Sequence, residues 1–129
     1  MHGKIGVATT KGLRCYRYWS TAMPHSRVIE VDPHTQRIEW QYADSPGYAF
    51  FTPFMGGAQR LHNGNTLITE AKFGRLFEVT RAGEVVWEYI NPHFAAYPDA
   101  ASRAYLPGEN NAIFRAHRYQ AADIPWLRD

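Results

Sequence analysis

Arg60 is the residue of this sequence whose chemistry is best suited to holding a ligand. A guanidinium is permanently charged and carries parallel donors, so it can bind a sulfate, phosphate or carboxylate through two hydrogen bonds. Gln59 and Glu70 belong to the same predicted hairpin and are the polar groups beside it. Two interpretations stay open: these residues bind a small anion, or Arg60 pairs with Glu70 across the hairpin as a structural contact.

Aromatic side chains gather just before this hairpin, among residues 48–55. Tyr48 and Phe54 are the candidates for ligand contact, because aromatic clefts suit flat, phenolic molecules. The alternative is that this loop packs between neighbouring sheets, since aromatic rings also fill cores well.

Histidine could supply a nucleophile, and two of the six histidines are candidates for this role. His25 precedes a strand and His62 lies in a turn; each is a candidate catalytic residue or a solvated loop residue. None of the six has the spacing of a zinc ligand set, and Cys15 is the single cysteine, so we expect no metal site and no intrachain disulfide. Gly56-Gly57 lacks the strand-to-helix context of a phosphate loop. The sequence therefore predicts no cofactor.

An internal repeat positions these residues. Residues 26–42 and 74–89 follow one pattern, in which Trp40 and Trp87 hold matching places 47 residues apart. Apolar and polar residues alternate within each copy, which indicates β-strands. Each copy is therefore predicted to be a two-stranded hairpin, with its tryptophan wedged between neighbouring sheets.

The stretch between the two copies supplies another hairpin. Asn63-Gly64 separates two apolar runs, and this dipeptide is the strongest short-range hairpin signal. Residues 57–90 are then four consecutive antiparallel strands. A four-stranded meander that recurs every ~40–50 residues is typical of a β-propeller blade.

The predicted fold is all-β, a partial β-propeller in one domain over residues 1–129. It holds about two to two and a half blades, each a four-stranded antiparallel meander. Residues 57–90 are the complete blade, residues 26–42 the outer strands of a preceding one, and residues 110–119 the start of a following one. A short helical turn is expected around residues 99–103.

Four segments, taken in order, resemble the C-terminal part of the arylsulfotransferase-type β-propellers: residues 26–33, 51–68, 74–89 and 114–119. The resemblance implies a six-bladed propeller whose enzymes move a sulfuryl group between phenols through a sulfated histidine, without a cofactor. It implies a reaction funnel at the propeller axis, with Arg60 and a histidine such as His25 lining it. The predicted innermost strand, residues 56–61, has no histidine where the family's nucleophile is expected.

Charge and hydropathy exclude several partners. The net charge is +2 and the basic residues are dispersed, so the sequence carries no footprint of nucleic-acid binding. No run approaches the ~20 apolar residues of a membrane span. The first residues lack the apolar core of a secretory signal, which predicts a cytoplasmic protein, or a periplasmic one whose signal was removed.

Incomplete blades predict self-association, because a blade cannot bury both faces alone and open strand edges must be covered. The alternative is that the few strands curl into a compact sandwich. The first functional hypothesis is a non-catalytic structural or binding module that associates with itself and presents its loops to a small anionic or aromatic ligand. The second is an arylsulfotransferase-like enzyme, active only as an oligomer, with His25 or His62 as nucleophile.

Overall fold

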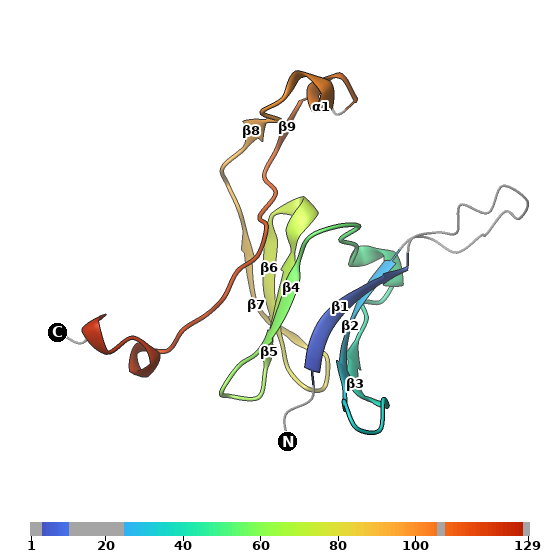
Figure 1. The fold of residues 1–129 in the computed structure, drawn as a ribbon, viewed down its shortest axis with the longest axis vertical. Coiled ribbons are helices and arrows are strands. Elements are labelled where there is room, and N and C mark those ends of the chain that lie inside the picture. The colour runs from blue at the N-terminus through green and yellow to red at the C-terminus, as the bar shows by residue number, and fades with distance from the viewer. Residues whose placement is uncertain (1–3, 11–24, 106–107, 128–129) are drawn as a thin grey trace, which may run out of the picture.

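The computed structural model describes residues 4–10, 25–105 and 108–127. Two antiparallel sheets dominate it, with a small third sheet and little helix, so the all-β prediction is confirmed (Figure 1). The first sheet has the order β1-β2-β3, with strands β1 (Lys4–Thr10), β2 (His25–Val31) and β3 (Ile38–Tyr42). The second has the order β4-β5-β6-β7, with strands β4 (Gly57–Arg60), β5 (Thr66–Glu70), β6 (Arg75–Val79) and β7 (Val85–Ile90).

The remaining elements are short. β8 (Ala95–Ala96) and β9 (Glu109–Asn110) pair beyond the end of the second sheet (Figure 1). The helix α1 (Ala100–Tyr105) follows β8 and precedes β9 in the chain, and it confirms the helical turn predicted around residues 99–103. Four single 3₁₀ turns complete the described chain: η1 (Gly47–Ala49), η2 (Ala71–Phe73), η3 (Ala121–Asp123) and η4 (Pro125–Leu127).

The four-stranded antiparallel meander predicted for residues 57–90 is confirmed strand by strand. Residues 26–42 form two paired strands as predicted, and β1 adds a third strand that was not predicted. Of residues 110–119, predicted to start a further blade, Asn110 belongs to β9 and pairs with β8, and residues 111–119 pair with no strand of the described chain.

The two hairpins of the repeat share one register. Both are antiparallel, and both shift register once, at the same place in the repeat. The matching pairs are Val28–Tyr42 with Leu76–Tyr89, and Glu30–Trp40 with Glu78–Trp87. Because paired residues lie on the same face of a sheet, each sheet carries a glutamate beside a tryptophan on one of its faces.

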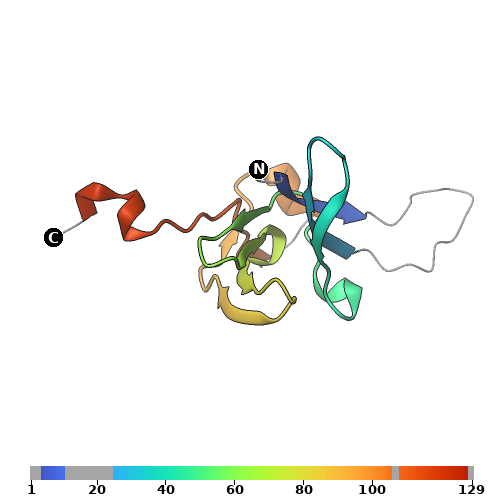
Figure 2. The ribbon, with the colours of Figure 1, turned by 90° about the horizontal axis from the view of Figure 1, so that it is seen from below.

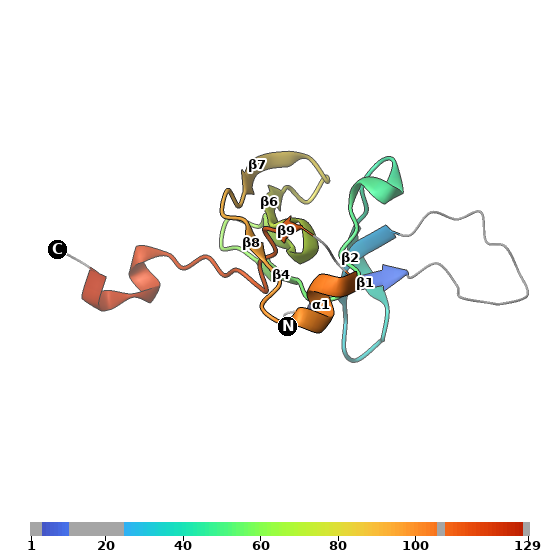
Figure 3. The ribbon, with the colours of Figure 1, turned by 90° about the horizontal axis from the view of Figure 1, so that it is seen from above.

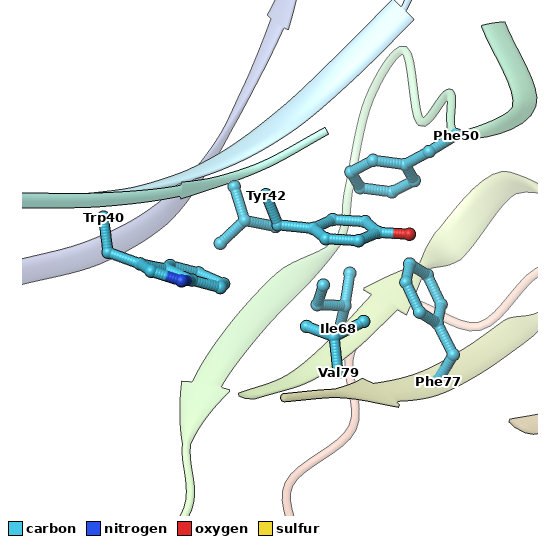
Figure 4. Close-up of a cluster of buried hydrophobic side chains, with 7 residues drawn as sticks. Trp40, Tyr42, Phe50, Ile68, Phe77 and Val79 are labelled. Carbon is cyan, nitrogen blue, oxygen red and sulfur yellow. The ribbon is translucent and has the colours of Figure 1, made fainter. Parts of the chain in front are cut away.

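The two sheets stack on each other. Seen from below and from above (Figures 2 and 3), the first sheet lies on one side of the second sheet, and the C-terminal residues lie on the other side. The residues between the sheets form one apolar cluster (Figure 4): Val28, Trp40 and Tyr42 from the first sheet, Ile68, Phe77 and Val79 from the second, and Phe50 from the loop before β4. Each fully buried side chain of this size contributes about 1.5–3 kcal/mol.

No sheet covers the tryptophan face of the second sheet in the described chain. Successive residues of a strand alternate between faces. Trp87 and Tyr89 therefore lie on the face of the second sheet that does not carry Phe77, and they point away from the first sheet. Their rings stack 6.4 Å apart and stay 41% and 40% exposed, whereas Trp40 is 9% exposed. The prediction of a wedged tryptophan is thus confirmed for Trp40 and wrong for Trp87 in the described chain. We call the face that carries Leu76, Glu78, Trp87 and Tyr89 the Trp87 face.

Gly74, which precedes β6, packs against Asn111 in the chain that follows the second sheet. It ends η2 with a φ of +59°, and a Cβ atom there would lie 2.2 Å from the carbonyl oxygen of Asn111. Asn111 is fixed in place, because its side chain and that of Asn91 each donate to the other residue's carbonyl oxygen at 2.9 Å. Only glycine fits this approach.

Gly74→Ala should therefore lower the free energy of unfolding by about 1–2 kcal/mol for left-handed backbone strain and by a further ~1–3 kcal/mol for the clash. Gly64→Ala is the matched control, because Gly64 has a φ of +86° and nothing within 4 Å of the added methyl group. It should show the strain cost alone. Urea unfolding measures both; equal losses in the two variants would contradict the packing described here.

Candidate functional site

Arg60 joins the two sheets through a carboxylate. Its guanidinium lies 2.6 Å from the carboxylate of Glu30 in β2, and 4.5 Å from the ring centroid of Trp40 in β3. The same group donates to the Thr66 hydroxyl at 2.5 Å and to the Gly64 carbonyl oxygen at 3.1 Å. Arg60 thus binds a carboxylate, as its chemistry predicts, but this carboxylate belongs to the neighbouring sheet of the same chain.

Arg81, in the turn between β6 and β7, completes this contact. Its carbonyl oxygen accepts a hydrogen bond from the Trp40 indole at 2.9 Å, and its guanidinium lies 3.5 Å from Glu30. The side chains of Glu30 and Arg60 are only 15% and 22% exposed, so solvent screens the pair weakly. A charge-assisted hydrogen bond of this kind contributes about 1.5–3 kcal/mol. The contact fixes where one sheet lies on the other.

A second group of the same kind lies on the Trp87 face. Arg118 forms an ion pair with Glu78 of β6, and its guanidinium lies 4.8 Å from the ring centroid of Trp87 in β7. Glu78 and Trp87 are the residues that match Glu30 and Trp40 in the repeat. One set of three residue types, glutamate, arginine and tryptophan, therefore recurs with the same contacts.

Residues 112–119 carry Arg118 across the Trp87 face, and we call them segment 112–119 (Figures 1 and 3). The Gln59 side chain donates to the carbonyl oxygen of Arg118 at 2.9 Å and accepts from its N–H at 2.8 Å. The Thr69 hydroxyl accepts from the N–H of Ala116 at 3.2 Å. Gln59, predicted as a ligand contact, thus binds the backbone of this segment.

Glu78 stays ionised beneath segment 112–119. Its side chain is only 7% exposed, and burial by itself raises the pKa of a carboxyl group. Hydrogen bonds from Asn65 and Asn63 and the ion pair with Arg118 outweigh that burial and hold the pKa of Glu78 below its usual value. The folded protein therefore favours the ionised form of Glu78 over the protonated form.

Glu70 does not pair with Arg60, contrary to the structural contact suggested by the sequence. Its carboxylate accepts a hydrogen bond from the Phe51 N–H at 2.9 Å and pairs with Arg75 at 3.2 Å. The register explains the difference, because Glu70 lies opposite Arg75 while Arg60 lies opposite Thr66.

The aromatic loop divides into a buried part and an exposed part. Phe50 enters the core, as the packing interpretation predicts, whereas Tyr48 and Phe54 are 56% and 52% exposed. The amino group of Lys72 lies 5.9 Å from the ring centroid of Phe54.

Lys72 also lies at a hollow of about 420 Å³ between η2 and the β8–α1–β9 region. Its amino group donates to the hydroxyl of Tyr97 at 2.5 Å. The other lining residues are mostly aromatic or amide side chains: Phe73, Phe94, Tyr105, Glu109, Asn110 and Asn111. Rings beside an ammonium group could hold a small aromatic or anionic molecule.

The two candidate histidines lie apart. His25 begins β2 beside Gly47, and His62 lies in the β4–β5 turn at the other end of the sheets (Figure 1). The imidazole of His62 is 3.7 Å from the carboxylate of Asp123. Within the described ranges, no group of three or more His, Cys, Asp or Glu side chains could hold a metal ion.

Glu30, Glu78 and Arg118 were not predicted as site residues. A signal for them was present, since each glutamate holds the same place in the repeat, and residues 116–118 share the pattern Ala-x-Arg with residues 58–60. Only the stacked sheets show that these matches mark one recurring contact.

No family model, curated protein or solved structure matches the chain significantly. The resemblance to arylsulfotransferase-type propellers therefore stays a prediction. Among the described helices, none has the length and apolar character needed to cross a membrane.

Glu78→Gln should lower the free energy of unfolding at pH 7 by about 1–3 kcal/mol, because Arg118 loses its anionic partner. The lowered pKa of Glu78 contributes stability above the carboxyl pKa of the unfolded chain, and this contribution is lost as the pH falls below it. The difference between wild type and variant should therefore shrink on acidification from pH 7 toward pH 3.

Glu88→Gln is the matched control for this prediction. Glu88 is 47% exposed and pairs with Arg75 at 2.5 Å, so its replacement should cost less than about 1 kcal/mol. Urea unfolding across the pH range measures both variants. A Glu78→Gln deficit that persists unchanged at pH 3 would show that the charge of Glu78 is not what Arg118 binds.

Proposed function

We propose that this chain is a non-catalytic structural module whose sheets stack in succession, as the blades of a β-propeller do, and that it associates with further sheets of its own kind. The observation that carries the proposal is the recurring glutamate–arginine–tryptophan contact. The first such group, around Arg60, lies between two stacked sheets. The second, around Arg118, lies on the Trp87 face, which no sheet of the described chain covers.

The interface inside the chain indicates what would cover the Trp87 face. There, the tryptophan face of the first sheet packs on Phe77 and Val79 of the second sheet, both fully buried. The repeat places Ile29 and Val31 of β2 where β6 has Phe77 and Val79. Ile29 and Val31 are only half-buried. The chain thus has one open tryptophan face and one partly open aliphatic face, and its own core shows that two such faces fit.

A second copy of the chain would join these faces head to tail. Such a contact is heterologous, so it builds a closed ring or an open row according to the rotation between copies. The outermost strand supports the same view, because all six residues of β7 are exposed and five of them are apolar or aromatic. Exposed apolar surface of this kind is typical of a face that another chain covers.

The geometry supports catalysis less well than assembly. The terminal nitrogens of Arg60 already donate to Glu30, Thr66 and Gly64. His25 begins β2 and His62 lies in the β4–β5 turn, and the start of β2 and that turn lie at opposite ends of the sheets (Figure 1). Turnover of an aryl sulfate donor with a phenol acceptor, abolished by His25→Ala or His62→Ala, would overturn the non-catalytic function.

Light scattering at micromolar concentration should therefore give a mass above the 14.8 kDa of one chain. Trp87→Ser should weaken the association at least tenfold, because a buried aromatic anchor at an interface typically contributes ~2 kcal/mol or more. Trp126→Ser is the matched control, because Trp126 is 81% exposed in η4, one of the C-terminal turns that lie apart from the sheets (Figure 1), and its loss should leave the association unchanged. A wild-type chain that stays monomeric would contradict the proposal.

A further inference from the structure

We infer that segment 112–119 of one copy pairs, as a β-strand, with the open edge of β1 in a second copy. This pairing rests on the self-association proposed above, and it specifies which strands meet and in which register. Segment 112–119 and β1 are each one half of a strand pair whose complete form, β4 with β5, is present in the same chain.

Segment 112–119 has the character of β4 but lacks a strand partner. Residues 116–118 share their alanine and arginine with residues 58–60 at the end of β4. Arg118 contacts its glutamate and tryptophan as Arg60 does. Whereas β4 pairs with β5, segment 112–119 pairs with no strand of the described chain.

From Phe114 onward, the backbone of segment 112–119 is bonded on one side only, whereas the N–H of Ile113 donates to the carbonyl oxygen of Ala71 at 2.9 Å. From there, every second residue forms a hydrogen bond with the second sheet or with Gly56 just before it, and these residues are Phe114, Ala116 and Arg118. The backbone groups of the alternate residues have no partner in the described chain, and these residues are Arg115, His117 and Tyr119. Successive residues of an extended chain direct their backbone groups to opposite sides. The segment therefore presents the open side of an edge strand.

β1 has the character of β5 but lacks a β4. It pairs with β2 in the register in which β5 pairs with β6, with Lys4–Val31 matching Thr66–Val79 and Gly6–Ile29 matching Ile68–Phe77. β4 occupies the second side of β5. By contrast, β1 lies beside β4 without pairing with it, and its second edge has no strand partner in the described chain.

The two halves cannot meet within one chain. The first sheet packs on the face of the second sheet that carries Phe77, and segment 112–119 lies on the Trp87 face. The sheet β4–β7 therefore stands between them, as the two views along the vertical axis of the molecule agree (Figures 2 and 3). The partner of each half must come from another copy.

The register of this pairing follows from that of β4 with β5. Carried over residue by residue, it gives four antiparallel pairs: Arg118 with Lys4, His117 with Ile5, Ala116 with Gly6, and Arg115 with Val7. The completed sheet has four strands, like β4–β7. In the chain itself, the sheet that contains Arg60 covers Trp40. By the same relation, the completed sheet, which contains Arg118, covers Trp87.

Cysteine cross-linking of the full chain tests the pairing. In a Cys15→Ser background, Ile5→Cys with His117→Cys places two thiols opposite each other on neighbouring copies. Mild oxidation should then yield covalent dimers and higher multimers on a non-reducing gel. Gly6→Cys with His117→Cys is the matched control, because adjacent residues of a strand face opposite sides of the sheet, and it should cross-link at least tenfold less.

Each outcome decides between the strand pairing and the proposed function. Association that Trp87→Ser weakens, but without cross-linking through Ile5→Cys and His117→Cys, would overturn the pairing and leave the structural module standing. Equal yields from both cysteine pairs would overturn the register. A monomeric wild-type chain would overturn both proposals.

Proline provides a second test that needs no cross-link. His117→Pro removes an N–H group that faces β1 of the next copy, and it leaves Arg118 in place for Glu78. We expect the association to weaken at least tenfold relative to His117→Ala. Equal association of the two variants would show that the backbone of residue 117 is not part of the contact.

Discussion

A carboxylate moved out of water loses several kcal/mol of hydration, which cations and hydrogen-bond donors of the protein must replace. Glu30 is such a group, and the second sheet supplies Arg60 and Arg81 to it. Trp40 lies beneath Arg60 and keeps water from the pair. Apolar packing is non-directional. The buried rings around this site therefore favour contact between the two sheets, but they do not determine how one sheet is placed on the other. The ion pair determines this placement, because only one placement of the sheets brings Glu30 and Arg60 together.

The same constraint acts on Glu78 with a different result. Its side chain is more buried than that of Glu30, at 7% against 15% exposed, although no further sheet of the described chain lies over it. Two asparagines of the β4–β5 turn and Arg118 supply the missing donors. Segment 112–119 thus satisfies the charge but covers little of the neighbouring rings, which explains why Trp87 remains 41% exposed. In our proposal, the Glu78–Arg118–Trp87 group is a contact between two stacked sheets of which only one sheet is present in the chain.

The local half of the fold could be predicted from the sequence. Alternation and the Asn63-Gly64 turn identify the strands of the second sheet because hairpin register depends on residues close in sequence. The long-range half could not. The structural partner that the sequence suggests for Arg60, as the alternative to a bound anion, is Glu70, ten positions away; the actual partner is Glu30, which only the stacking of the sheets brings near.

Repeats predict which residues are equivalent, but they do not predict which surfaces are covered. Trp40 and Trp87 hold the same place in two copies of one pattern, yet one is buried and the other is not. Burial depends on the neighbour that each sheet has, and the repeat carries no information on that neighbour. Likewise, β1 was not predicted because its strand partner within the described ranges, β2, follows after a long gap in sequence.

The central claim is that a further sheet, from another copy of the chain, packs on the Trp87 face. Backbone hydrogen exchange at two protein concentrations tests this claim most directly. As the concentration rises into the range where the chain associates, amides of β7 and of Arg115, His117 and Tyr119 should exchange more slowly, while those of α1 stay unchanged. Exchange that slows elsewhere on an associated chain, with these amides unaffected, would contradict the account.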